Sequence, residues 1–152
     1  MPESSELTPL PESFAEIVDD FHALQQRQRL ELLLEFSREL PALPEPYRSN
    51  HEVMEPVAEC QSPVFVAVEV TGGPDDEVRI FFDAPPEAPT TRGFAGILAT
   101  GLQGLSAQQV LAVPDDVPQR LGLTEAVSPL RLRGMAGMLA RIKRQIRTGL
   151  AR

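Results

Sequence analysis

Apolar residues recur with two different spacings along the chain, which divides it into helical ends and a strand-rich middle. Near the start they fall at the i, i+3, i+4 and i+7 positions of one helical face: Phe14, Ile17, Val18 and Phe21. Pro11 can open this helix, and Ser13 and Glu16 have the spacing of a capping box. A second helix is predicted from about Gln26 to Leu40, where Pro41 ends it because proline lacks the amide hydrogen that a helix interior needs.

The middle of the chain is rich in β-branched residues, which favour strands. Residues 64–70 read Val-Phe-Val-Ala-Val-Glu-Val, and residues 78–82 read Val-Arg-Ile-Phe-Phe. A cluster of glycine, proline and aspartate separates the two segments, so together they predict a β-hairpin. A short strand around residues 54–57 is expected before the hairpin, and Pro56 would confine it to the edge of the sheet.

The second half of the chain is predicted to be helical again. A helix over about residues 91–105 contains four glycines, which indicate close packing against a neighbour: Gly93, Gly96, Gly101 and Gly104. Ser106 and Gln109 have capping-box spacing at the start of a short helix. Ser128 and Pro129 are typical of the N-cap and first position of a final helix. The whole pattern predicts an α+β fold in which a small antiparallel sheet packs against several helices.

Length and composition suit a globular protein. The 152 residues fit one domain, so residues 1–10 are expected to be a flexible N-terminal tail and residues 11–152 a single domain. A hydrophobic fraction of 42% and a charged fraction of 24% are typical of soluble proteins. No apolar run approaches the roughly eighteen residues of a membrane span, and the acidic start does not resemble a secretory signal. We therefore expect a cytoplasmic location.

Charge is unevenly distributed along the chain. The net charge is −8, but residues 128–152 contain seven arginines and lysines and no acid. An acidic protein is a poor candidate for non-specific nucleic-acid binding, so neither nucleic acid nor membrane is expected as a partner. The basic segment is interpreted as a solvated helix face, whose charge suits a helix C-terminus. Contact with RNA or an anionic membrane is the alternative.

Cys60 is the only cysteine, and it falls between the first and second predicted strands. A single thiolate excludes cysteine-based zinc and iron–sulfur sites, so no metal site is expected. His51 is close in sequence, but nothing indicates the orienting group and oxyanion site of a Cys–His hydrolase. A peroxide-reducing thiol protein is also disfavoured, because there is no resolving cysteine. Cys60 is therefore either a buried apolar residue or a reactive thiol.

Four sequence features point to one family. Residues 57–65 read Val-Ala-Glu-Cys-Gln-Ser-Pro-Val-Phe, Asn50 lies shortly before them, and Arg92-Gly93-Phe94 follows the predicted hairpin. The final helix opens with Ser-Pro-Leu-Arg at residues 128–131, followed by Gly134. In this order the features resemble the SufE family of sulfur acceptors, over about residues 14–147. The family pattern is Val-x-Gly-Cys-Gln-Ser-x-Val-aromatic at the cysteine and Ser/Thr-Pro-x-Arg-x-x-Gly at the helix.

The resemblance implies a function and partners. Cys60 would take persulfide sulfur from a SufS-type cysteine desulfurase, stimulate that enzyme and pass the sulfur to a SufBCD-type scaffold for iron–sulfur cluster assembly. The chain would be a sulfur carrier and not an enzyme, and no cofactor is expected because pyridoxal phosphate belongs to the desulfurase. The implied fold is α+β and similar to the IscU cluster scaffold. Two alternatives remain: the same chemistry in a CsdA-partnered branch, and an interaction module in which Cys60 is inert.

Two residues near the cysteine depart from the family pattern. Glu59 stands where the family usually has glycine, and its charge would disfavour the thiolate. Phe65 replaces the usual tryptophan and keeps an aromatic side chain. Val57, Pro63 and Phe65 are expected to give the thiol an apolar cover.

Other polar residues are candidates to support the thiol or to dock a partner. Gln61 and Ser62 are expected to shape the loop through hydrogen bonds to the backbone. Arg131 matches the family's arginine at the final helix, and it is the first candidate for a positive group that favours the thiolate. Glu87 and Arg92 are candidates for partner docking, with solvated surface charges as the alternative.

Overall fold

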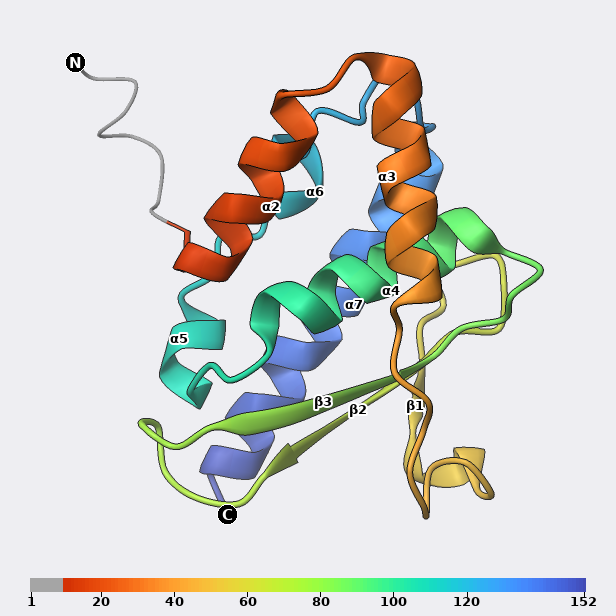
Figure 1. The fold of residues 1–152 in the computed structure, drawn as a ribbon. Helices are drawn as coiled ribbons and strands as arrows, with labels where there is room; N and C mark the ends of the chain where they lie inside the picture. Colours follow the sequence, from red (N-terminus) through yellow and green to blue (C-terminus); the bar gives the residue numbers. More distant parts are fainter. Residues whose placement is uncertain (1–9) are drawn as a thin grey trace.

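A computed structural model describes residues 10–152, with helices at both ends of the chain and a sheet between them (Figure 1). Within residues 10–152, the first two helices are α2 (Glu12–His22) and α3 (Gln26–Arg38). The expected tail lies outside the described residues except for Leu10, which is partly buried against the core.

The start of α2 differs from the predicted capping box. Pro11 is the N-cap, and no side chain caps the helix. Ser13 lies inside the helix, where its hydroxyl donates a hydrogen bond of 2.6 Å to the Gly101 carbonyl. A tertiary contact thus occupies the hydroxyl that the local spacing assigned to the cap. Helix α3 instead carries a capping box that the sequence analysis missed, formed by Gln25 and Gln28.

Three antiparallel strands form a sheet in the order β1-β2-β3. They are β1 (Glu55–Pro56), β2 (Phe65–Val70) and β3 (Val78–Asp83). The hairpin and the short edge strand agree with the prediction. A single 3-10 turn, η1 (His51–Val53), precedes β1, and the Asn50 side chain caps it by accepting a hydrogen bond from the Glu52 amide.

Helix α4 (Pro89–Leu102) packs closely against α3, as its glycines predicted. A Cβ atom at Gly93 would lie 2.5 Å from the Leu33 carbonyl oxygen, and one at Gly96 would lie 2.1 Å from the Phe36 carbonyl oxygen. The helix begins and ends earlier than predicted. Pro89 occupies its first turn, and Gly104, with a φ of +80°, follows its end.

The remaining helices are α5 (Ala107–Leu111), α6 (Val117–Arg120) and α7 (Pro129–Leu150). Ser106 and Gln109 form the predicted capping box of α5, and Ser128 caps α7. Helix α7 contacts β2, and its apolar face is buried in the main core, as predicted for these residues: Met135, Met138, Leu139, Ile142 and Ile146. The opposite face of the sheet carries a smaller cluster around Tyr47, Met54 and Ala67.

The basic face of α7 differs from the interpretation that it is simply solvated. Three of its six basic side chains form ion pairs: Arg141 and Arg144 with acids in or next to β1, and Lys143 with Asp115. Lys143 is buried, and its ammonium group also donates to the Val113 carbonyl. Within residues 10–152, no helix combines the length and apolar character needed to cross a membrane.

Candidate functional site

Cys60 lies in the loop that joins β1 to β2, as predicted. Main-chain hydrogen bonds close the base of the loop: the Val57 amide donates to the Val64 carbonyl at 2.9 Å, and the Cys60 amide donates to the Val57 carbonyl at 3.1 Å. Val57 and Val64 are buried in the main core. The Cys60 side chain is half-buried and is a free thiol. The loop therefore has a fixed base and carries the cysteine at its partly exposed end.

Two glycines of α7 allow the loop to lie directly on the helix. A Cβ atom at Gly134 would lie 3.0 Å from the Cys60 Sγ, and one at Gly137 would lie 2.7 Å from the Glu59 carboxylate. These positions are three residues apart, so they share one helix face. The absence of a side chain at these two positions creates the space that Glu59 and Cys60 occupy.

Arg141 lies one turn beyond Gly137 and binds the loop. Its Nη1 lies 2.6 Å from a Glu59 carboxylate oxygen, and its Nε donates to the Pro56 carbonyl at 3.1 Å. Its Nε also lies 3.6 Å from the Glu55 carboxylate. The sequence analysis did not single out Arg141. The signal was its position on the same helix face as Gly134 and Gly137.

The surroundings of Cys60 disfavour its thiolate. Burial, and to a lesser extent the Glu59 carboxylate, raise the pKa of the thiol to about 11, and the Arg141 guanidinium offsets part of this rise. Cys60 is therefore protonated at neutral pH in this conformation. The effect of Glu59 has the predicted direction, but the cation that acts on the thiol is Arg141 and not Arg131.

A pocket of about 430 Å³ lies beside the thiol. Its walls come from the cysteine loop, the start of α4 and the start of α7. It brings together six of the residues selected from the sequence: Glu59, Cys60, Gln61, Ser62, Glu87 and Arg131. Arg131 thus lies on the wall of the pocket from its position in the first turn of α7. Two acids and one base therefore line the space next to the cysteine.

The sequence and the fold both have close relatives among known proteins. Residues 15–146 match the family described as "SufE: Fe-S metabolism associated domain". The chain belongs to the SufE family. An uncharacterised SufE-like protein of Mycobacterium tuberculosis is 54% identical over 138 residues, which cover 91% of this chain and 94% of that protein.

More distant SufE relatives include SufE-like protein 1, chloroplastic/mitochondrial, of Arabidopsis thaliana. It is 28% identical over 131 residues, which cover 86% of this chain and 33% of the plant protein. The solution structure of a hypothetical protein from Thermus thermophilus matches with a TM-score of 0.81 at 38% identity, covering 95% of this chain and all of that one. The expected family and α+β fold are confirmed, and membership places the chain in iron–sulfur metabolism.

Two of the residues selected by SufE resemblance lie away from the pocket. The Phe65 ring stacks on His51, with centroids 4.5 Å apart, in the cluster on the opposite face of the sheet. Arg92 donates from Nε to the Ser37 carbonyl at 2.8 Å and from Nη1 to the Ala84 carbonyl. It therefore connects α3 to the segment after β3, which is a structural role. Of the expected apolar cover, Val57 belongs to the main core, against which Cys60 packs, whereas Phe65 lies in the other cluster. The main chain of α7 at Gly134 also covers the thiol.

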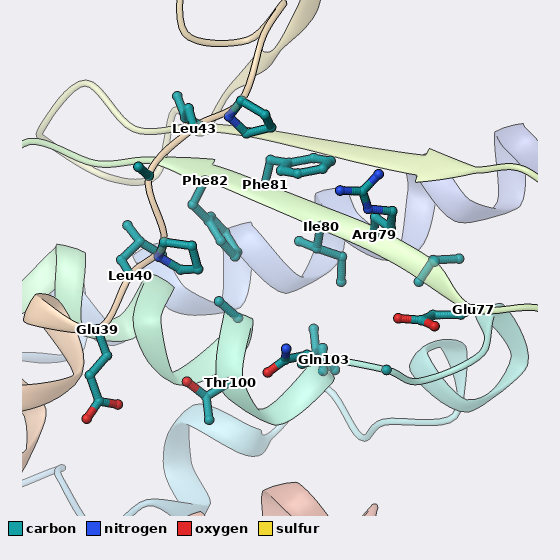
Figure 2. A pocket seen from close by; sticks show the side chains of 17 residues that line it. Glu39, Leu40, Leu43, Glu77, Arg79, Ile80, Phe81, Phe82, Thr100 and Gln103 are labelled. Atoms are coloured by element: carbon teal, nitrogen blue, oxygen red, sulfur yellow. The ribbon is translucent and has the colours of Figure 1, made fainter.

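A second pocket, of about 480 Å³, lies along the outer edge of β3 (Figure 2). Figure 2 shows Ile80 and Phe82 on β3, Leu40 in the segment after α3, and Thr100 and Gln103 near the end of α4. The cysteine pocket is lined by the opposite end of α4, and a helix of 14 residues spans roughly 20 Å. The two pockets are therefore separate. Among residues 10–152, no group of three or more His, Cys, Asp or Glu side chains has an arrangement suited to a metal ion.

Proposed function

We propose that this SufE-family chain accepts persulfide sulfur on Cys60 from a SufS-type cysteine desulfurase and delivers it to a SufBCD-type cluster scaffold. The observation that supports this most is the position of the single thiol. It lies in a loop with a fixed base, beside a pocket with two acids and one base in its walls. A loop of this kind can carry its thiol into a partner's active site.

The proposed transfer requires one thiol from each protein. The Cys60 thiolate attacks the outer sulfur of the desulfurase persulfide, and a new S–S bond forms on Cys60. The S–S bond of the donor breaks, and the donor cysteine leaves as a thiolate that takes up a proton. The number of persulfides is unchanged, so the step needs no oxidant or reductant. Removal of the persulfide frees the desulfurase for its next turnover, which accounts for the proposed stimulation.

The raised pKa of Cys60 fits a carrier that must be inert until it meets its partner. A protonated thiol is a poor nucleophile, so the closed loop protects Cys60 from oxidants and unrelated electrophiles. Contact with a desulfurase would move the loop off α7 and place the thiol in water or in the partner's active site, where its pKa is no longer raised by burial. We place this chemistry in the cytoplasm, whose reducing conditions keep a free thiol reduced.

Intact-mass measurement tests the proposal directly. The purified chain is mixed with a SufS-type desulfurase and free cysteine, and its mass is recorded before and after treatment with a reductant. We expect a gain of one sulfur atom that the reductant reverses and that is absent in Cys60→Ser. Cys60 is the only cysteine, so the gain reports on this site alone.

The same measurement distinguishes the alternative partners. No gain with an active SufS-type enzyme, followed by a gain with a CsdA-type enzyme, would assign the chain to that branch. No gain with either enzyme would contradict sulfur acceptance and favour an interaction module with an inert Cys60.

A further inference from the structure

We propose that Arg141 is a positioning residue that holds the Cys60 loop closed on α7 by binding Glu59 and the Pro56 carbonyl. This inference deepens the proposed sulfur transfer and rests on it. It assigns the closed state of the loop to one side chain of α7, and it gives Glu59 a role that the family's glycine could not have.

Arg141 holds both ends of the segment that leads to the cysteine. Its Nε donates to Pro56 at the end of β1, and its Nη1 meets the Glu59 carboxylate, directly before Cys60. Its Nη1 also donates to the Gly137 carbonyl at 3.2 Å, which fixes the guanidinium against its own helix. The planar guanidinium of arginine carries several N–H donors in a fixed geometry, so it can contact separate acceptors at once. A lysine ammonium could not reproduce this.

The Arg141 side of this contact is better shielded from water than in an ordinary surface ion pair, although Glu59 itself is exposed. The Arg141 side chain is 19% exposed and the Glu59 side chain is 43% exposed. Exposed ion pairs contribute little because water screens them and both side chains lose entropy. Here Gly137 leaves space for the carboxylate against the helix, and the guanidinium is already held by backbone carbonyls.

The charges around Cys60 allow two roles for Arg141 to be told apart. Glu59 is in the same loop, Arg141 comes from α7, and Glu87 and Arg131 line the adjoining pocket. Arg141 lowers the pKa of Cys60, so its loss would make the thiol less reactive if it acted through charge alone. If it holds the loop closed, its loss makes the thiol more reactive, because the open loop exposes Cys60 to water. The two roles predict opposite signs.

The test measures the rate at which iodoacetamide alkylates Cys60 in the full chain, as a function of pH. We expect Arg141→Ala to raise the rate at neutral pH by about fivefold and to shift the pH profile toward that of an ordinary thiol. Arg141→Lys should restore part of the effect, since it keeps the charge but not the guanidinium. Arg144→Ala is the matched control: Arg144 lies on the same helix and shares Glu55 with Arg141, but its ion pair is with Glu55 and not with Glu59, so its loss should leave the rate unchanged.

A second pair of variants tests whether Arg141 acts through Glu59. In the Glu59→Ala background, Arg141→Ala should raise the rate less than it does in the unchanged chain, because the contact with Glu59 is already broken and only the hydrogen bond to the Pro56 carbonyl is left to lose. If Arg141→Ala still raises the rate there to the same extent, the proposed contact is not the cause. This comparison is informative even if one single variant is too unstable to purify, because Glu59→Ala alone must also raise the rate.

Three results would overturn the proposal. A slower reaction in Arg141→Ala would show that the residue acts only through its charge. An unchanged rate would show that the loop does not depend on it. An equal rise in Arg144→Ala would show general loosening of the fold. None of these measurements uses a desulfurase, so their failure is separate from failure of the sulfur-acceptance experiment.

Discussion

Gly134 and Gly137 show how single residues determine the environment of the cysteine. Each lies on the face of α7 under the loop, and a Cβ at either position would press on Cys60 or Glu59. The thiol is consequently sheltered by main chain. Shelter and the Glu59 charge together raise the pKa of Cys60 to about 11, and Arg141 offsets part of this. Reactivity at this site is therefore controlled by access more than by intrinsic acidity.

Arg131 and Arg133 provide a matched pair for testing the pocket. Both are exposed residues near the start of α7, but only Arg131 lines the pocket beside Cys60. We expect Arg131→Ala to weaken desulfurase binding by about threefold to tenfold, because a charge at the rim of an interface mainly affects association. Arg133→Ala should change it less than about twofold. Titration calorimetry of both variants with a SufS-type enzyme measures this, and equal effects would contradict a role for the pocket in docking.

At the site, sequence reasoning located the cysteine and its immediate neighbours but not the partner of Glu59. Cys60 and Glu87 meet in one pocket, as their selection from the family pattern suggested. Arg141 and Glu59 lie far apart in the sequence, and no local motif connects them. Only the packing of α7 against the loop brings them together. Phe65 was misplaced for a related reason: alternation along β2 directs it to the opposite face of the sheet from the core residues Val64 and Val66.

At the scale of elements, α4 depends on glycine for its approach to α3. Close contact of helix backbones is possible because Gly93 and Gly96 have no side chains at the crossing. The helix boundaries were predicted to within a few residues, and the caps at Ser106 and Ser128 were correct. The cap at Ser13 was wrong because a long-range hydrogen bond to Gly101 took its place. Local spacing identifies possible caps, and tertiary contacts determine which of them form.

Gly96→Ala tests the helix crossing. A Cβ there would lie 2.1 Å from the Phe36 carbonyl oxygen, and backbone atoms cannot move aside cheaply. We expect the free energy of unfolding to fall by about 2 kcal/mol, despite the better helix propensity of alanine. Thr100→Ala, at an exposed position of the same helix, should change it by less than about 0.5 kcal/mol. Urea unfolding measures both, and a stabilised Gly96→Ala would contradict the close packing of α3 and α4.

At the scale of the whole molecule, the sheet separates a large core from a small one. The α+β class, the hairpin and the edge strand followed from periodicity and turn residues alone. The face of the sheet that α7 covers could not be predicted in this way, because both faces of β2 carry apolar residues. Val66 points to the main core and Ala67 to the smaller cluster. In that smaller cluster Tyr47 stacks on Phe81 and donates a hydrogen bond of 2.7 Å to the Glu69 carboxylate.

Tyr47 makes the integrity of the smaller cluster measurable. Burial and the hydrogen bond to Glu69 together raise the pKa of its phenol to about 12. The folded state holds this proton more tightly than the unfolded state, so the stabilisation is complete below about pH 10 and is lost as the pH rises toward 12. The chain has one tyrosine and no tryptophan, so ultraviolet absorbance reports this titration alone. A folded-state midpoint near that of free tyrosine would contradict the burial, and Tyr47→Phe should lose less stability in alkali.

The outer edge of β3 affects whether copies of the protein can pair strand to strand at high concentration. The Val78 amide donates to the Leu105 carbonyl, so alternation along the strand directs the main-chain groups of Ile80 and Phe82 away from β2 as well. Arg92 occupies the next carbonyl on that side, at Ala84, and the nearby segment contains Pro41 and Pro44, which have no amide hydrogen to donate. The open stretch is too short to template strand addition by a second copy. We therefore expect little edge-to-edge pairing between copies of this chain at β3.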